Sequence, residues 1–283
     1  STSKVQYATN FEGIQPTDKA IDKTFYLIGD AGLYSEGGMS NGLLALQNHI
    51  SNDSKDDDYV IFLGDNIYPS GLPDTDEKGR TNAENSLNAQ IKSLQGFKGK
   101  TVFIPGNHDW HANGLKGLKR QENYIESALG KNTFLPENGC PMESIAINDA
   151  IQLIIIDSQW YLENWDHHPG INDDCNIKTR EHFFDEVEDE LKKAQNKTVI
   201  FAMHHPMFTN GPHGGHLPAA KHLFPFQQKI PLPILGSLMA QIRTQGGVSS
   251  QDRYNTRYHE LMSRLETIVS DENNVVFVSG HEH

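Results

Sequence analysis

Short runs of almost continuous apolar residues recur along this chain, and helical patterns separate most of them. The runs cover residues 24–28, 59–63, 101–104, 151–156, 198–203 and 275–278. Because both faces of these runs are apolar, they predict strands that are buried on both sides. Candidate helices cover residues 40–51, 83–95, 118–129, 179–195 and 252–270. This alternation predicts an α/β domain that contains much parallel sheet.

The length of the chain, 283 residues, suits a single domain with a sizeable core. We expect residues 1–22 to form an irregular N-terminal lead and residues 23–283 to form the domain. Two segments, 66–82 and 205–250, are rich in Gly, Pro, Asn and His and do not fit the alternation. Long irregular segments of this kind are uncommon unless they cover or form a site.

The chain is acidic, with 24 Lys and Arg residues against 37 Asp and Glu residues and a formal net charge of −13. Such a chain gains no counterion-release energy from a phosphate backbone, so we expect no nucleic-acid partner. Small phosphate compounds remain compatible with this charge, because bound metal ions can reverse the sign of the local field. No stretch approaches the ~20 apolar residues of a transmembrane helix, so we expect no transmembrane segment.

Two cysteines, Cys140 and Cys175, lie in polar, turn-like surroundings. They could be unrelated thiols, since a free Cys is often simply a small apolar residue. The polar surroundings favour a disulfide between them instead, which would imply an oxidising compartment. The chain begins at Ser1 without a signal peptide, which fits a processed export product as well as recombinant expression. We therefore expect an extracytoplasmic protein that is periplasmic, secreted or surface-attached.

Five of the predicted strands are followed by side chains that can bind a metal ion. The groups are Gly29-Asp30-Ala31-Gly32, Gly64-Asp65-Asn66-Ile67-Tyr68, Gly106-Asn107-His108-Asp109, His204-His205-Pro206 and Gly280-His281-Glu282-His283. Each group alone has an ordinary structural explanation, such as an Asx turn or a helix N-cap. Together, and in this order, they predict ligands that converge on one edge of a sheet, where α/β proteins bind their ligands.

This series resembles the motifs of the calcineurin-like metallophosphoesterase superfamily, from Asp30 to His283. Many members carry Asp-x-His in the first motif, whereas here Gly32 stands in place of the His. The second motif supplies Tyr68 three residues after Asp65. Gly-Asp-x-Gly combined with Gly-Asp-x-x-Tyr is similar to purple acid phosphatases, in which a tyrosinate binds ferric iron. The resemblance implies a layered α/β/β/α sandwich that forms a metallophosphoesterase catalytic domain.

The resemblance also implies two metal ions and their ligands. The first metal would be held by Asp30, Asp65, Tyr68 and His283. The second would be held by Asp65, Asn107, His204 and His281, so that the carboxylate of Asp65 bridges both ions. We expect Fe(III) at the Tyr68 site, with Fe(II), Zn or Mn at the second site. This division agrees with ligand chemistry, because carboxylate and phenolate suit a trivalent ion while imidazole and amide oxygens suit a divalent one.

Three further histidines are candidates for the site. His204 and His205 compete for one ligand position, and the family pattern, which places the ligand two residues before Pro206, selects His204. His213 and His108 match the positions of catalytic histidines in purple acid phosphatases of the mammalian type. Either one is expected to give a proton to the leaving alcohol.

The predicted function is hydrolysis of small phosphate esters by a dinuclear metal site. The resemblance implies that a metal-bound hydroxide attacks phosphorus in line, with a phosphomonoesterase of acid phosphatase type as the leading reading. A phosphodiesterase or nucleotide hydrolase on the same scaffold is one alternative, and a non-catalytic interaction domain stapled by metal is another. The chain ends at His283, a predicted ligand; because termini fray, we expect the domain to be truncated at its C-terminus. The sequence makes no prediction about the oligomeric state.

Overall fold

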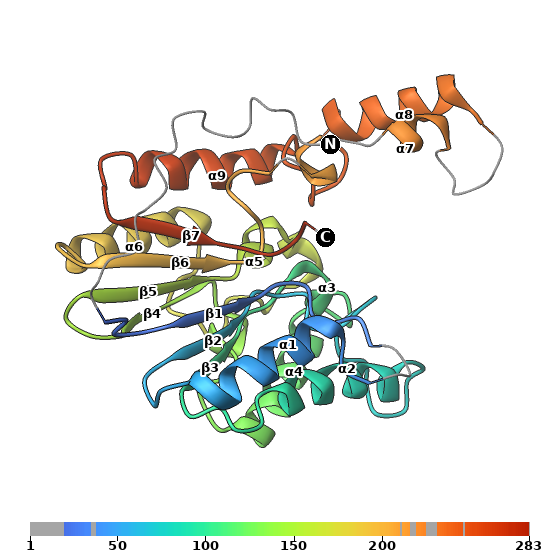
Figure 1. Cartoon of the computed structure of the whole chain (residues 1–283). Helices are drawn as coiled ribbons and strands as arrows, with labels where there is room; N and C mark the ends of the chain where they lie inside the picture. Colours follow the sequence, from blue (N-terminus) through green and yellow to red (C-terminus); the bar gives the residue numbers. More distant parts are fainter. Residues whose placement is uncertain are drawn as a thin grey trace.

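The computed structural model describes residues 20–34, 38–209, 211–215, 219–224, 231–245 and 247–282. Two sheets lie face to face, and helices cover the outer side of each (Figure 1). This arrangement is the predicted α/β/β/α sandwich, which is therefore confirmed. Residues 1–19, most of the predicted N-terminal lead, lie outside the described residues.

The first sheet contains three parallel strands in the order β1-β2-β3. They are β1 (Phe25–Ile28), β2 (Tyr59–Phe62) and β3 (Lys100–Phe103). The helices that follow each of these strands in the chain are α1 (Asn41–Asp53), α2 (Arg80–Ser93) and α4 (Leu115–Leu129), and they lie on the outer face of this sheet (Figure 1). All six elements agree with the predicted positions to within a few residues.

The second sheet contains four strands in the order β4-β5-β6-β7. They are β4 (Met142–Ala146), β5 (Ile151–Ile156), β6 (Thr198–Met203) and β7 (Val275–Val278). β4 is antiparallel to β5, whereas β5, β6 and β7 are parallel. The helices α6 (Arg180–Lys193) and α9 (Thr256–Ile268) cover its outer face (Figure 1). The prediction of one shared sheet edge is wrong, because the strands that lead to the candidate ligands belong to two sheets.

The core between the two sheets is built by alternation along the strands. Ile61 of β2 packs in one cluster with Leu153 and Ile155 of β5. Its neighbours Val60 and Phe62 belong to the other cluster, which includes the helices. Since all five side chains are completely buried, both faces of these strands are apolar, as the sequence pattern requires.

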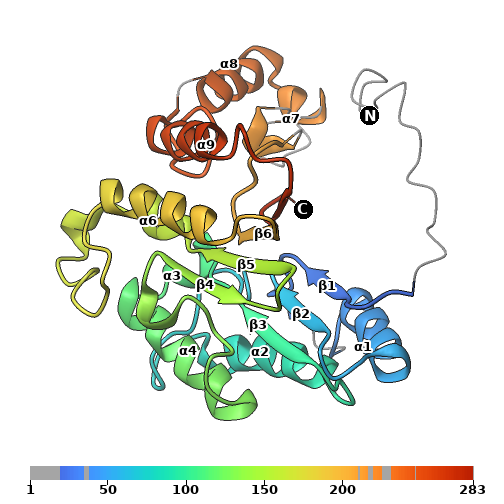
Figure 2. The same ribbon diagram turned by 90° about the vertical axis from the view of Figure 1, so that its left-hand side faces the viewer.

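The predicted irregular segment 205–250 contains more helix than expected. It includes η4 (Pro212–Gly214), α7 (Ala219–Leu223) and α8 (Pro233–Gln245). α7 and α8 lie on the α9 side of the molecule, away from both sheets (Figures 1 and 2). Among the described residues, no helix combines the length and the apolar character that a membrane crossing needs.

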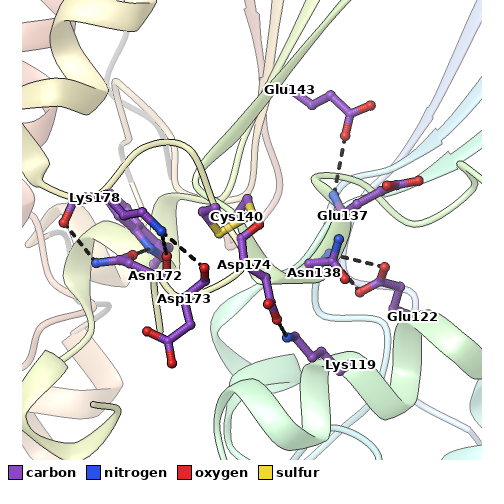
Figure 3. Close-up of a disulfide and its surroundings, with 12 residues drawn as sticks. Lys119, Glu122, Glu137, Asn138, Cys140, Glu143, Asn172, Asp173, Asp174 and Lys178 are labelled. Atoms are coloured by element: carbon purple, nitrogen blue, oxygen red, sulfur yellow. Dashed lines mark hydrogen bonds and ion pairs between the residues drawn. A yellow bond between two sulfur atoms is a disulfide. The ribbon is translucent and has the colours of Figure 1, made fainter. Parts of the chain in front are cut away.

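The two cysteines form a disulfide, as predicted. The Cα atoms of Cys140 and Cys175 are 5.4 Å apart, and the bridge closes a sequence separation of 35 residues. It joins the turn before β4 to the loop before α6, where an ion pair between Lys119 and Asp174 lies beside it (Figure 3). The bridged segment also contains two short helices, α5 (Ser158–Leu162) and η3 (Trp165–His167).

Candidate metal centre

The carboxyl ends of five strands deliver the predicted ligands to one place. Asp30 and Asp65 follow β1 and β2, and Asn107 begins the short helix α3 (Asn107–Trp110) after β3. From the second sheet, His204 follows β6 directly and His281 follows β7. Ligand atoms of Asp30, Asp65 and His204 all lie within 4.8 Å of one another. The carboxyl ends of strands from both sheets therefore converge on a cluster of metal-competent side chains.

The side chain of His204 is buried and fixed at one ring nitrogen. Its Nδ1 lies 2.8 Å from the carbonyl oxygen of Leu63, which can only accept, so Nδ1 carries the proton. The other nitrogen, Nε2, then presents a lone pair. It lies 3.1 Å from Oδ1 of Asn107 and 3.4 Å from Oδ1 of Asp65, and both of these oxygens are acceptors.

His281 repeats this arrangement from the opposite side. Its Nε2 lies 3.2 Å from the carbonyl oxygen of Gln251, so the proton is on Nε2 and the lone pair is on Nδ1. This Nδ1 lies 3.1 Å from Nε2 of His204. Burial, followed by the neighbouring histidines, holds the pKa of His281 well below its usual range, so the ring is neutral. A neutral imidazole is the form that binds a metal ion.

Three acceptor atoms therefore lie within 3.4 Å of a fourth, Nε2 of His204, inside the protein. The four atoms belong to Asp65, Asn107, His204 and His281. Buried acceptors without a donor between them are costly, and a cation placed among them removes that cost. Without a metal a proton takes this place: burial alone would lower the pKa of His204, but Asp65 outweighs it and raises the pKa to about 9. These residues fit a bound divalent metal ion.

Tyr68 connects the carboxylates of Asp30 and Asp65. Its hydroxyl lies 3.0 Å from Oδ1 of Asp30 and 2.9 Å from Oδ2 of Asp65. Burial and then these two carboxylates raise the pKa of Tyr68 far above its usual range, so the phenol keeps its proton when no metal is bound. A phenolate between two carboxylates would need a strongly charged cation, which fits the donor set predicted for the first metal. His283, the fourth predicted ligand of that metal, lies outside the described residues.

The absence of a histidine at position 32 has a steric cause. A Cβ atom on Gly32 would lie 2.5 Å from the backbone oxygen of Asp65 and 2.5 Å from the backbone nitrogen of Ile67. The backbones are held together there by two hydrogen bonds, from Gly32 N to Asp65 O and from Tyr68 N to Gly32 O. No side chain fits at this position, and the same contact brings Tyr68 into the site.

The backbone at three of the predicted ligands is in the left-handed region. The φ angles are 54° for Asp30, 54° for Asp65 and 78° for His281. Non-glycine residues rarely adopt this conformation, which costs about 1 kcal/mol or more per residue. Such residues cluster at functional sites, because a tight turn can aim a side chain that a relaxed backbone would point elsewhere.

Asp109 joins two of the ligand-bearing turns, a role that the sequence reading missed. Its fully buried carboxylate accepts from the backbone N–H of Gly106 at 2.8 Å and of Asn66 at 3.1 Å. It also accepts from the side chain of Gln121 at 2.9 Å. The turns that carry Asp65 and Asn107 are therefore held by one carboxylate. The only sequence signal was its place in the third motif.

His205 lies beside the cluster, but both of its ring nitrogens contact side chains outside it. Its Nδ1 lies 2.7 Å from Oγ of Ser158 and its Nε2 lies 2.7 Å from Oε1 of Gln251, so neighbouring side chains occupy both ring nitrogens. Burial lowers the pKa of His205 to about 3, which keeps the ring neutral. This geometry favours His204 over His205 as the ligand. The contacts of Gln251 with His205 and His281 had no signal in the sequence, since Gln251 lies far along the chain from both histidines.

The two predicted catalytic histidines lie at the border of the cluster. His108 donates from its backbone N–H to Asp65 at 2.9 Å, and its Nε2 lies 4.0 Å from Oδ2 of Asp65. The ring of His213 lies tilted against that of His281, with centroids 4.2 Å apart. Its Nδ1 lies 2.8 Å from Oδ1 of Asp252, a buried carboxylate that was not predicted. Both rings are near the ligands without being among the four acceptors.

Comparison with known proteins agrees with this site. A family model described as calcineurin-like phosphoesterase matches residues 23–235. The chain belongs to the calcineurin-like phosphoesterase family. The match includes the strand ends that carry Asp30, Asp65, Asn107 and His204, while His281 lies beyond it. Family membership agrees with the cluster of metal-competent side chains at these strand ends.

Two curated relatives are purple acid phosphatases of Arabidopsis thaliana. The chain is 23% identical over 222 residues to "Purple acid phosphatase 3", which covers 76% of this chain and 56% of the relative. It is 24% identical over 231 residues to "Purple acid phosphatase 7", and this match covers 78% of this chain and 66% of the relative. The chain thus spans between about half and two thirds of the length of these relatives. Among solved structures, PhoD covers 91% of this chain and 50% of its own, at 12% identity and a TM-score of 0.46.

Proposed function

We propose that this chain is a phosphomonoesterase of the purple acid phosphatase type. The observation that carries the proposal is the set of acceptors around Asp65: an imidazole and amide group on one side, and the phenol of Tyr68 with a second carboxylate on the other. Neutral donors and anionic oxygen donors are thereby separated around one shared carboxylate, which suits a pair of metal ions that differ in charge.

The residues divide into two sets of metal ligands. Asp30, Asp65 and Tyr68, with His283, would hold Fe(III). Asp65, Asn107, His204 and His281 would hold Fe(II), Zn or Mn. The two ions would clamp the phosphate and supply an activated water for in-line attack at phosphorus. Leu63 and Gln251 contribute through their carbonyl oxygens, which fix the rotation of the two imidazole ligands.

His213 and His108 would handle the proton of the leaving alcohol. Nδ1 of His213 lies 2.8 Å from Oδ1 of Asp252, which fixes the orientation of the ring beside the ligands. Nδ1 of His108 lies 2.6 Å from the carbonyl oxygen of Pro69, which holds Nδ1–H as a donor in the same way. Each ring would therefore be held in one tautomer, with one nitrogen directed away from its anchor.

An extracytoplasmic location is part of the proposal. Cys140 and Cys175 form a disulfide. In most proteins disulfides persist only in an oxidising environment. A small phosphate ester is the proposed substrate, and the acidic net charge of −13 keeps the prediction that nucleic acid is not a partner.

Hydrolysis of p-nitrophenyl phosphate and of bis(p-nitrophenyl) phosphate by the purified metal-loaded protein tests the function. We expect the monoester to be preferred, two metal ions per chain with iron among them, and a visible absorption band from Tyr68 on ferric iron. A preference for the diester would favour a phosphodiesterase, and a metal-loaded protein that hydrolyses neither would favour the non-catalytic alternative. A colourless protein that contains only zinc or manganese would remove the purple subtype.

Asp65→Asn is the matched test of the shared ligand. Because one carboxylate is proposed to serve both ions, we expect this variant to lose both metals together and to lose activity. Full metal content with near-normal turnover would show that Asp65 does not bridge. Metal content measured by mass spectrometry separates this outcome from a simple loss of catalysis.

A further inference from the structure

A cleft of about 880 Å³ opens beside the metal centre. One wall is formed by the turn between α3 and α4 and by the first turns of α4, and the other by residues 163–171. Its volume is within the range of sites that hold small organic ligands. The side chains that line it and bear on its chemistry are Trp110, His111, Lys116, Arg120, His167 and His168.

The cleft begins one side chain away from the metal ligands. His108, whose Nε2 lies 4.0 Å from Asp65, makes an edge contact with His111, with ring centroids 5.0 Å apart. His111 in turn lines the cleft. A phosphate ester that is bound through its phosphate at Asp65 could therefore extend its alcohol part past His108 and into the cleft.

The acidic side chains of the cleft contact other side chains in or beside its walls, whereas one basic side chain has no ion pair among the described residues. Two carboxylates line it, but each is already engaged: Asp74 lies 3.5 Å from Nη1 of Arg120, and Glu163 lies 3.4 Å from Nε2 of His168. Glu163 also accepts from the side chain of Gln159 at 2.7 Å. Both carboxylates therefore already have partners in or beside the walls of the cleft.

Lys116 is the other basic side chain, besides Arg120, that lines the cleft. It is exposed, lies one helical turn before Arg120 on α4, and forms no ion pair with any residue that the structure describes. His111 and His167 are also exposed at the cleft and add positive charge when they are protonated. The lysine and the two exposed imidazoles can donate hydrogen bonds to an anion in this cleft, although the chain as a whole carries a net charge of −13.

We propose that this cleft binds a second anionic group of the substrate, so that the preferred substrates are phosphate monoesters whose alcohol part carries another phosphate. The inference rests on the proposed function, because it assumes that one phosphate is bound at the metal centre. Lys116 is the residue that recognises the distal phosphate. Arg120 shapes the cleft, because its guanidinium donates hydrogen bonds to the carbonyl oxygens of Leu72 and Ala112.

A matched pair of substrates tests the inference: the bisphosphate and the monophosphate of 1,6-hexanediol, which differ only in the distal phosphate. We expect the ratio of their kcat/KM values to exceed the factor of two that two equivalent esters would give. In Lys116→Gln this ratio should fall by about 2- to 5-fold at low salt, the effect of removing one partly exposed charge pair. In the unmodified protein the ratio should also fall as ionic strength rises.

Lys98→Gln is the control, since Lys98 is also exposed but precedes β3 at the opposite end of the strand from Asn107. An equal fall in the ratio for both variants would show a general charge effect and overturn the inference, as would an unchanged ratio in Lys116→Gln. If neither hexanediol ester nor p-nitrophenyl phosphate is hydrolysed, the proposed function fails instead. Calorimetric binding of the bisphosphate to the metal-loaded protein and to Lys116→Gln then decides the cleft independently of turnover: weaker binding to the variant supports it, and equal binding refutes it.

Discussion

Replacing Asp109 by Ala should both destabilise the protein and release its metals. The carboxylate of Asp109 accepts from two backbone N–H groups, those of Gly106 and Asn66, which cannot turn toward another acceptor. Each buried donor left without a partner costs about 1–3 kcal/mol, so the two together cost about 2–6 kcal/mol of unfolding free energy. Burial and the nearby charge of Asp65 raise the pKa of Asp109 to about 6, and relief of this repulsion offsets part of the loss. We therefore expect about 2–4 kcal/mol.

Asp58→Ala is the matched control. Asp58 is also fully buried, and its carboxylate accepts from the backbone N–H groups of Thr24 at 2.8 Å and Lys55 at 2.9 Å. It precedes β2, so it lies at the end of the strand opposite to Asp65. Loss of two backbone partners should again cost about 2–6 kcal/mol. Because no ligand-bearing turn depends on it, Asp58→Ala should keep its metals.

Urea unfolding of the metal-free proteins gives the stability difference, and mass spectrometry of the folded, metal-loaded proteins gives the metal content. The reasoning requires that both variants lose stability and that only Asp109→Ala loses metal. Equal metal content in the two variants would refute the claim that Asp109 positions the turns of Asp65 and Asn107. A stability change below about 1 kcal/mol in Asp109→Ala would refute the estimate for its buried donors.

Three other predictions follow from single features of the structure. Replacing Cys140 and Cys175 by Ser should lower the free energy of unfolding in urea by about 4 kcal/mol, the entropy expected for a closed loop of this length, and an effect below about 1 kcal/mol would contradict it. Burial raises the pKa of Asp157 to about 8, so between pH 4 and 8 the folded chain holds a proton that the unfolded chain has lost; stability should fall by at most about 1.4 kcal/mol per pH unit, and Asp157→Asn should flatten this slope in urea unfolding. His213→Ala should slow hydrolysis of alkyl phosphates much more than that of p-nitrophenyl phosphate while metal content is unchanged, because nitrophenolate needs little protonation; an equal loss on both substrates would point to phosphate binding, and loss of metal would make His213 a ligand.

The regular elements were predictable where apolar runs are bounded by polar turns. β5 and β6 match their predicted ranges, and α1 begins where Ser40 caps the helix by accepting from the backbone N–H of Leu43. The division into two sheets did not follow from the pattern of the strands themselves. Ile61 and Val60 are equally apolar and equally buried, yet one faces the second sheet and the other faces the helices, so composition cannot distinguish the two faces.

The helix α8 was missed for a different reason. Its first residue is Pro233 and it contains Gly236, and both were interpreted as signs of a loop. Proline is favourable at the first position of a helix, where its missing N–H would be unpaired in any case. Ile234, next to it, is 85% exposed, so an apolar residue in this helix does not mark a buried face.

The candidate site shows most clearly where sequence reasoning ends. The motifs indicated which side chains could bind metal, and the structure brings the described ones together, but their assignment to two metal ions stays a prediction. The direction in which each histidine ligand presents its lone pair depends on groups that belong to no sequence motif. The carbonyl oxygens of Leu63 and Gln251 decide which ring nitrogen of His204 and His281 faces inward. Any residue has such a carbonyl, so its position is set by the fold alone. A metal site is therefore specified at two levels, by residue types that a sequence displays and by backbone acceptors that appear only when the chain is folded.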